Sequence, residues 1–197
     1  MDNDPELMVS VWPWGTLHGA GAIEDGITTG VSSWRRMAPD THPAMAKAAG
    51  NYLNSQLVLV EAQQNGFDEG IVLDTAGYVS EGSGENIFVV LDGRVLTPPL
   101  GDSILPGITR GLVIDLCKEM GVEVVEQRVA REMLYFAEEV FFTGTAAEVT
   151  PVRSVDRRPV GDGKPGDLTK RLQEAFFAIV KGEVPDRFGW LTHVNPK

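Results

Sequence analysis

Short apolar runs bounded by glycine, proline, asparagine and aspartate divide much of the chain into predicted strands. In chain order these strands cover 9–12, 28–34, 71–73, 78–80, 86–91, 94–97, 122–129 and 139–143, followed by a hairpin through 149–160. Asp92-Gly93 separates two of the runs and is a strong signal for a two-residue hairpin turn. Because the strands of a hairpin pair in antiparallel fashion, the pattern excludes a purely parallel sheet.

Apolar residues that recur at intervals of three and four predict helices between these strands. The predicted helices span 52–65, 108–120, 131–136 and 167–181. The stripes expected to face the core are Leu53, Leu57, Val60 and Gln64 in the first helix and Ile108, Leu112, Leu116 and Met120 in the second. Mixed strands and helices, together with the hairpins, indicate an α/β or α+β fold with a mixed sheet.

The length of 197 residues and a hydrophobic content of 43% are sufficient for a folded core, which we expect to form one domain over 1–197 with a loose segment at 1–8. The formal net charge is -11, because 28 acidic residues outnumber 17 basic ones. Binding to nucleic acid or to an anionic membrane needs a clustered excess of Lys and Arg, which the sequence does not show. We therefore expect a small-molecule substrate.

Cysteine and histidine usage narrows the chemistry further. Cys117 is the single cysteine, so the chain cannot form an internal disulfide. The sequence has neither a charged and apolar leader nor an apolar run of about 18 residues, which predicts a cytoplasmic protein. His18, His42 and His193 show no spacing typical of metal ligands, so we expect no metal site.

Three features are unusual for mere scaffolding. Gly107-Ile108-Thr109 opens a predicted helix after Pro106, which leaves free backbone N–H groups and a hydroxyl group for an anion. The segment 143–148 follows a predicted strand with small residues that admit a ligand, and Thr145 offers a second hydroxyl group. Lys47 lies among small residues, and a lysine enclosed there would have a lowered pKa and could form a Schiff base. Each feature alone also fits an ordinary turn or a solvated lysine.

Four sequence blocks carry a resemblance to a known family. They are KAAGNY at 47–52, YVSEGSGENIF at 78–88, LPGITR at 105–110 and TGTAAEVTPV at 143–152. In combination they resemble the signature blocks of the class IV (fold-type IV) pyridoxal-phosphate aminotransferases, and most of all those of the branched-chain amino acid aminotransferases. The likeness extends from about Val11 to 189–191 and implies the large C-terminal domain of that fold, a mixed sheet or pseudo-barrel with surrounding helices. It also implies transamination of leucine, isoleucine and valine with 2-oxoglutarate in a homodimer or larger assembly.

The resemblance assigns roles to individual residues around pyridoxal 5′-phosphate. Lys47 would form the Schiff base and then move the proton between the substrate Cα and the cofactor. Glu81 would pair with the pyridine nitrogen and keep it protonated, and Tyr52 would hydrogen-bond the phenolic oxygen. The other implied cofactor contacts are Leu105 against the ring and Ile108, Thr109 and Thr145 at the phosphate. The implied substrate contacts are Trp14, Gly144, Thr145 and Ala146.

Several of these residues also have ordinary structural explanations. Glu81 lies in a glycine-flanked setting that would suit a surface turn. Tyr52 and Trp14 would equally suit the core as large aromatic side chains. Arg36 is a further candidate near the site, although a solvated arginine is the commoner fate.

The sequence departs from the family pattern in two places. A smaller N-terminal domain, which in the family supplies an arginine to the cofactor phosphate and part of the substrate pocket, is absent from these residues. Leu17 stands where the branched-chain branch often has a tyrosine. From these departures we expect readily dialysed cofactor and low activity in the isolated chain.

Three functions therefore stay open. The first is a branched-chain aminotransferase. The second is D-amino-acid transamination or aminodeoxychorismate lyase activity on the same scaffold, because Lys47 and Glu81 would serve each of these reactions. The third is a cofactor-binding or oligomerising module without catalysis.

Overall fold

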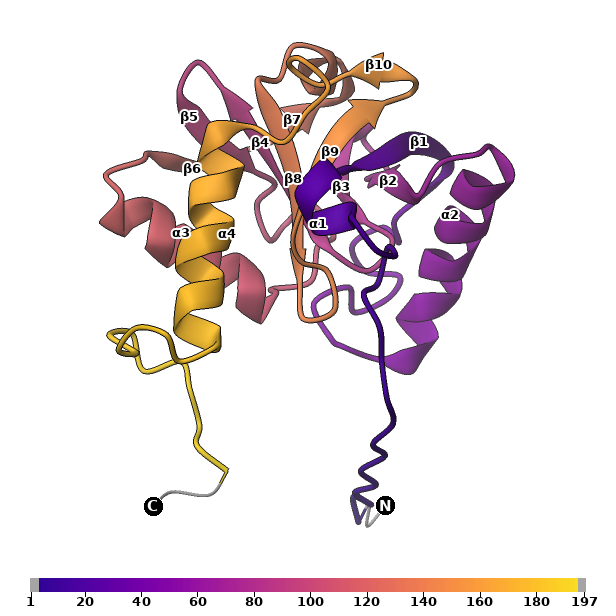
Figure 1. The fold of residues 1–197 in the computed structure, drawn as a ribbon. Coiled ribbons are helices and arrows are strands. Elements are labelled where there is room, and N and C mark those ends of the chain that lie inside the picture. Colours follow the sequence, from indigo (N-terminus) through magenta and orange to yellow (C-terminus); the bar gives the residue numbers. More distant parts are fainter. Residues whose placement is uncertain (1–3, 195–197) are drawn as a thin grey trace.

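A mixed sheet of ten strands forms the centre of the computed structural model, which describes residues 4–194 (Figure 1). The strands are β1 (Ile27–Arg35), β2 (Glu69–Leu73), β3 (Tyr78–Gly82), β4 (Asn86–Leu91), β5 (Arg94–Thr97), β6 (Val124–Glu126), β7 (Val129–Ala130), β8 (Glu139–Gly144), β9 (Glu148–Val155) and β10 (Arg158–Pro159). Their order is β6-β5-β4-β8-β9-β1-β2-β3-β7, with β10 paired to β9. β1 runs parallel to β2 and β9, and β5 runs parallel to β6, while the other pairs are antiparallel. The mixed class predicted from the sequence is confirmed.

Helices cover the sheet on different sides (Figure 1). They are α1 (Ala22–Asp25), η1 (Ala49–Asn51), α2 (Tyr52–Gln64), α3 (Ile108–Glu119), η2 (Arg131–Tyr135) and α4 (Asp167–Val180), of which η1 and η2 are 3-10 helices. α3 and α4 pack together against β8, and α2 packs on β1 and β2. The three long helices begin where the sequence predicts and end one residue earlier. None of the described helices is long and apolar enough to cross a membrane.

The apolar core has two parts because the central strands are buried on both faces. In β4, Ile87 and Val89 face one cluster, whereas Phe88 and Val90 face a second cluster formed with α3 and α4. Strands buried on both sides read as continuous apolar runs, which is why β4 is apolar from Ile87 onward. The first cluster draws side chains from β2 and β3 as well as from β4 and β5, so the sheet curls around it. This curl confirms the expected pseudo-barrel.

The hairpin predicted at Asp92-Gly93 is also confirmed. It joins β4 to β5 with Leu91 opposite Arg94. Asp92 and Gly93 have φ values of 51° and 69°. Two successive positive φ values match the twist of the flanking strands, and this requirement explains the Asp-Gly sequence.

Two strand predictions are wrong. Residues 9–12 form no strand, because no neighbouring strand pairs with them, and Val9 and Val11 are 77% and 92% exposed. The single strand predicted over 122–129 is divided into β6 and β7, which lie at opposite edges of the sheet.

The face that α2 buries differs from the predicted stripe. Leu53 is 72% exposed, whereas the buried residues of the helix are Ser55, Val58 and Ala62. The reason is close approach, since a Cβ at Gly70 of β2 would lie 2.6 Å from Val58 Cγ1. Because position 70 is a glycine, Val58 fills the space beside β2, and the face with Ser55, Val58 and Ala62 packs on the sheet. The predicted stripe of α3 is partly wrong as well, because Ile108 is 78% exposed at its first turn.

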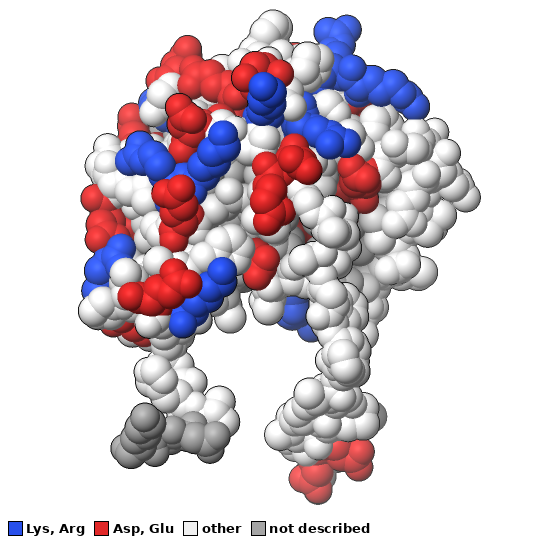
Figure 2. Space-filling model, viewed as in Figure 1, with Lys and Arg blue, Asp and Glu red and all other residues white. Residues whose placement is uncertain are grey.

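Surface charge differs between the side of the molecule formed by α3 and α4 and the side formed by α2. On the face that Figure 2 shows, acidic and basic side chains are interspersed over α3 and α4, while the side formed by α2 is largely uncharged. α2 itself carries exposed apolar side chains, among them Leu57 and Val60 with exposed fractions of 38% and 44%.

Glu139 of β8 caps the N-terminus of α4. Its carboxylate accepts hydrogen bonds from Leu168 N at 2.9 Å, Thr169 N at 2.8 Å and Thr169 Oγ1 at 2.6 Å. These bonds satisfy donors that the helix itself leaves unpaired, and the negative charge favours the positive end of the helix dipole. We expect Glu139→Ala to lower the free energy of unfolding by about 1–2 kcal/mol in urea denaturation. Glu174→Ala, an exposed change on the same helix, is the control, and an equal loss in both variants would contradict the capping role.

Candidate active site

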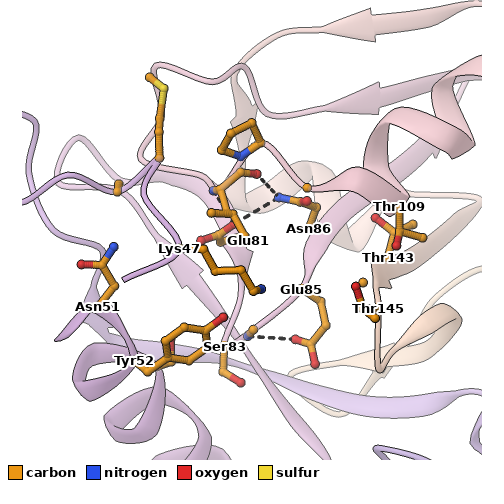
Figure 3. Close-up of a pocket in the computed structure, with 18 of the residues that line it drawn as sticks. Lys47, Asn51, Tyr52, Glu81, Ser83, Glu85, Asn86, Thr109, Thr143 and Thr145 are labelled. Atoms are coloured by element: carbon orange, nitrogen blue, oxygen red, sulfur yellow. Dashed lines mark hydrogen bonds between the residues drawn. The ribbon is translucent and has the colours of Figure 1, made fainter. Parts of the chain in front are cut away.

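Most of the predicted site residues line one cavity of about 280 Å³. It lies where the loop before α2, the β3–β4 connection, the start of α3 and the end of β8 meet (Figure 3). The predicted residues along it are Lys47, Tyr52, Glu81, Leu105, Ile108, Thr109, Gly144 and Thr145. Trp14 and Ala146 lie instead on an adjoining cavity of about 620 Å³, which also includes Lys47, Tyr52 and Thr145.

Lys47 is exposed, so of the two alternatives weighed from the sequence the enclosed lysine is wrong. Its small neighbours form a surface loop at the rim of the cavity instead of a closed wall. Its side chain nevertheless extends into the cavity (Figure 3), and its Nζ lies 5.8 Å from the centre of the Tyr52 ring. Asn51, buried just before α2, fixes the loop by donating from Nδ2 to Pro43 O at 3.0 Å and to Ala46 O at 2.9 Å.

Glu81 is buried at the floor of the cavity in a network of donors. Arg36 Nη2 lies 2.5 Å from Glu81 Oε1, and Asn86 Nδ2 and the Leu105 backbone N–H donate to Oε2 at 3.1 and 3.0 Å. Burial raises the pKa of Glu81 to about 7, against the opposing effect of the Arg36 guanidinium. Arg36 is only 6% exposed, so the solvated fate weighed for it from the sequence is wrong.

Hydroxyl groups gather at the opposite side of the cavity from Tyr52. Thr109 lies in the first turn of α3, Thr143 lies near the end of β8, and Thr145 lies in the turn that follows β8 (Figure 3). Thr143 Oγ1 is buried without a hydrogen-bond partner among the described residues. The first N–H groups of α3 point to the same region, because a helix leaves its leading donors unpaired. This end is therefore built to accept an anion.

Chemically, the cavity presents three different ends. Lys47 offers a primary amine, Glu81 a buried carboxyl group that can share a proton with a basic nitrogen, and Thr109 with the start of α3 an anion site. A flat ligand with an aldehyde, a ring nitrogen and a phosphate group carries all three complementary functions. The unpaired Thr143 hydroxyl group shows that the anion end has a donor left for such a ligand.

Some residues that build the site were missed from the sequence. Asn86 lies inside one signature block, and Thr143 begins another, so their place in the blocks was the available signal. Asn51 lies inside the block that contains Lys47. Arg36, a candidate from the sequence, does line the cavity. Only its pairing with Glu81 was missed, because Glu81 is 45 residues away in the sequence.

Comparisons with known proteins agree on one family. The family model described as amino-transferase class IV matches residues 2–155. The branched-chain-amino-acid aminotransferase of Escherichia coli strain K12 is 56% identical over 190 residues, which cover 96% of this chain and 62% of the relative. The chain thus spans about three fifths of the length of the curated relatives it matches.

Solved structures give the same result. The crystal structure of the E. coli branched-chain amino acid aminotransferase matches with a TM-score of 0.91 at 58% identity, covering 93% of this chain and 60% of that chain. The branched-chain aminotransferase from the archaeon Thermoproteus uzoniensis with norvaline matches with a TM-score of 0.86 at 44% identity, covering 92% and 59%. The branched-chain amino acid aminotransferase from Thermobaculum terrenum in its PLP-form matches with a TM-score of 0.83 at 39% identity, covering 86% and 55%.

Proposed function

We propose that this chain, which belongs to the class IV aminotransferase family, forms the pyridoxal-phosphate-binding large domain of a branched-chain amino acid aminotransferase. The observation that carries the proposal is the convergence of Lys47, Glu81 and Thr109 on one cavity. The names of the similar proteins support the substrate class. A homodimer or larger assembly and a cytoplasmic location stay predictions.

The proposed cofactor contacts follow the three ends of the cavity. Lys47 Nζ would hold pyridoxal phosphate covalently, because a primary amine bonds reversibly to an aldehyde. Glu81 would keep the ring nitrogen protonated, and Tyr52 would hydrogen-bond the phenolic oxygen beside Lys47. Thr109, Thr145 and the N–H groups of Ile108 and Thr109 would bind the phosphate, with Leu105 against the ring. When bound, pyridoxal phosphate supplies an electron sink for charge that develops at the substrate Cα.

We assign the substrate side to the larger cavity. Trp14 would form an aromatic wall for the branched side chain, and it is 64% exposed toward solvent in this chain. Gly144, Thr145 and Ala146 would present N–H groups to the substrate carboxylate at the junction of the two cavities. Lys47 lines both cavities and would take up the Cα proton as a general base.

Spectroscopy and half-reactions test this function against its alternatives. The purified chain is titrated with pyridoxal phosphate and then mixed with L-leucine or D-alanine while the cofactor absorbance is followed. We expect a spectral change on cofactor addition and a faster half-reaction with L-leucine. A faster reaction with D-alanine would favour D-amino-acid chemistry, and absence of any cofactor spectrum would favour a non-catalytic module.

Gly107 is expected to contribute to cofactor affinity although it bears no side chain. A Cβ at this position would lie 2.1 Å from Asn86 Oδ1. Gly107→Ala therefore displaces Asn86, whose Nδ2 holds both Glu81 Oε2 and Leu105 O. We expect the dissociation constant of pyridoxal phosphate to rise by about tenfold or more in an absorbance titration.

Gly101→Ala is the matched control for this prediction, because no atom lies within 4 Å of a Cβ at Gly101. Its cofactor affinity is expected to stay unchanged. Equal affinities in the wild type and Gly107→Ala would show that Asn86 has no part in forming the site.

A further inference from the structure

Beside the cavities that contain Lys47, three titratable side chains meet that the proposed function does not use together. His18 lies in the turn before α1, Glu69 begins β2, and Glu85 immediately precedes β4. One ligand atom from each side chain lies within 4.8 Å of the others. All three residues line the larger cavity. The fold thus assembles a cluster from positions that are far apart in the sequence.

Both carboxylates are held in place by backbone donors. Glu69 Oε1 accepts from Gly70 N at 2.7 Å and from Ser83 N at 3.1 Å, and Glu85 Oε2 accepts from Gly84 N at 3.1 Å. The other oxygen of each carboxylate accepts none of these bonds. Glu69 and Glu85 are only 1% and 4% exposed, so both carboxyl groups are shielded from water. Buried charges of this kind are normally paired or bound to a metal ion.

His18 supplies an independent observation. Its side chain is only 5% exposed, and Nε2 lies 3.4 Å from Glu85 Oε1. Among the described residues, this buried nitrogen has no hydrogen-bond partner. The distance to Glu85 is that of an ion pair when the imidazole is protonated. A neutral imidazole in the same position directs its nitrogen at the carboxylates as a metal ligand does.

We propose that His18 Nε2 and one oxygen each from Glu69 and Glu85 form a binding site for a divalent transition-metal ion of the Zn²⁺ type. A nitrogen and two oxygens are ligands that Zn²⁺ accepts at about 2.0–2.2 Å, whereas Mg²⁺ prefers oxygen alone. Ligation at that distance draws the three atoms closer together than they are now. The ion attaches the turn that contains His18 to the sheet, and its remaining coordination position faces the larger cavity.

Calorimetric titration with ZnCl₂ tests the site in the purified chain without added cofactor. We expect one ion per chain in the wild type. Mutation of a residue that only orients a metal ligand typically lowers metal affinity by about tenfold or more. Loss of the ligand itself should lower the affinity at least as much, so we expect His18→Ala to weaken Zn²⁺ binding by about tenfold or more. His193→Ala is the matched control, because His193 is exposed and outside the cluster, and its affinity stays unchanged.

A rise in melting temperature with Zn²⁺ is the second readout, because a ligand that binds the folded chain stabilises it. Glu69→Gln repeats the test on a second ligand, and circular dichroism establishes that each variant is folded. Zn²⁺ binding of equal strength in the wild type, His18→Ala and Glu69→Gln would overturn the proposal. Absence of one-to-one binding in the wild type, or equal binding of Mg²⁺, would overturn it as well. None of these outcomes depends on aminotransferase activity, so the proposal can fail without the proposed function failing.

Discussion

Replacement of Lys47 by alanine is expected to abolish covalent attachment of pyridoxal phosphate. Among the described residues that line the two cavities, Lys47 is the only lysine. An alanine at this position would offer no amine to the aldehyde. The visible absorbance of the covalent link disappears, and borohydride reduction leaves no labelled peptide. Turnover falls by at least about 10²–10⁴-fold, the range for loss of a positioned acid or base, because Lys47 Nζ is also the proposed base for the Cα proton.

Lys118→Ala is the matched control for this substitution. Lys118 is exposed on α3, 3.5 Å from Asp115, and lies outside both cavities. This variant retains the label and the absorbance. Mass spectrometry that places the reduced adduct on Lys118 or Lys170 in the wild type would show that Lys47 has been assigned wrongly.

The second large effect is expected from Glu81→Gln. A glutamine amide cannot share the proton of a ring nitrogen as the carboxyl group does, so we expect a bound cofactor and a half-reaction slowed by about 10²-fold or more. The same change leaves the buried Arg36 without its ionic partner. Removal of one member of a buried ion pair typically costs about 3–5 kcal/mol, and urea denaturation of the cofactor-free chain measures this loss.

Glu132→Gln, an exposed change on η2, controls for removal of a negative charge. Stopped-flow absorbance with L-leucine compares the two variants at saturating cofactor and at a temperature where both are folded. A Glu81→Gln half-reaction as fast as that of Glu132→Gln would remove Glu81 from the proposed catalytic residues.

Local signals explain why much of the fold could be predicted from the sequence. The Asp92-Gly93 turn and the start of α3 at Ile108 depend on neighbouring residues, and both are confirmed. The buried face of α2 could not be predicted in this way. It is selected by the close approach of Val58 to Gly70, which depends on how helix and sheet pack.

The candidate site, like α2, has features that depend on packing between distant parts of the chain and could not be predicted from the sequence. Lys47 and Glu81 lie in blocks that the sequence displays, and the cavity contains both. The burial of Arg36 depends on Glu81, Asn54 and Ser103, which come from separate parts of the chain. The exposure of Lys47 likewise depends on the path of its loop, so small neighbours alone could not establish enclosure.

Asn86 and Leu105 together set the distance between the Glu81 carboxyl group and the start of α3. Asn86 Nδ2 donates to Glu81 Oε2 and to Leu105 O, and Leu105 N donates back to the same carboxylate oxygen. The carboxyl end of the cavity and the loop that leads into α3 are therefore tied by one set of bonds, and their separation is fixed before any ligand arrives. We therefore expect a molecule whose basic nitrogen and anionic group are spaced differently to reach one end of the cavity but not both.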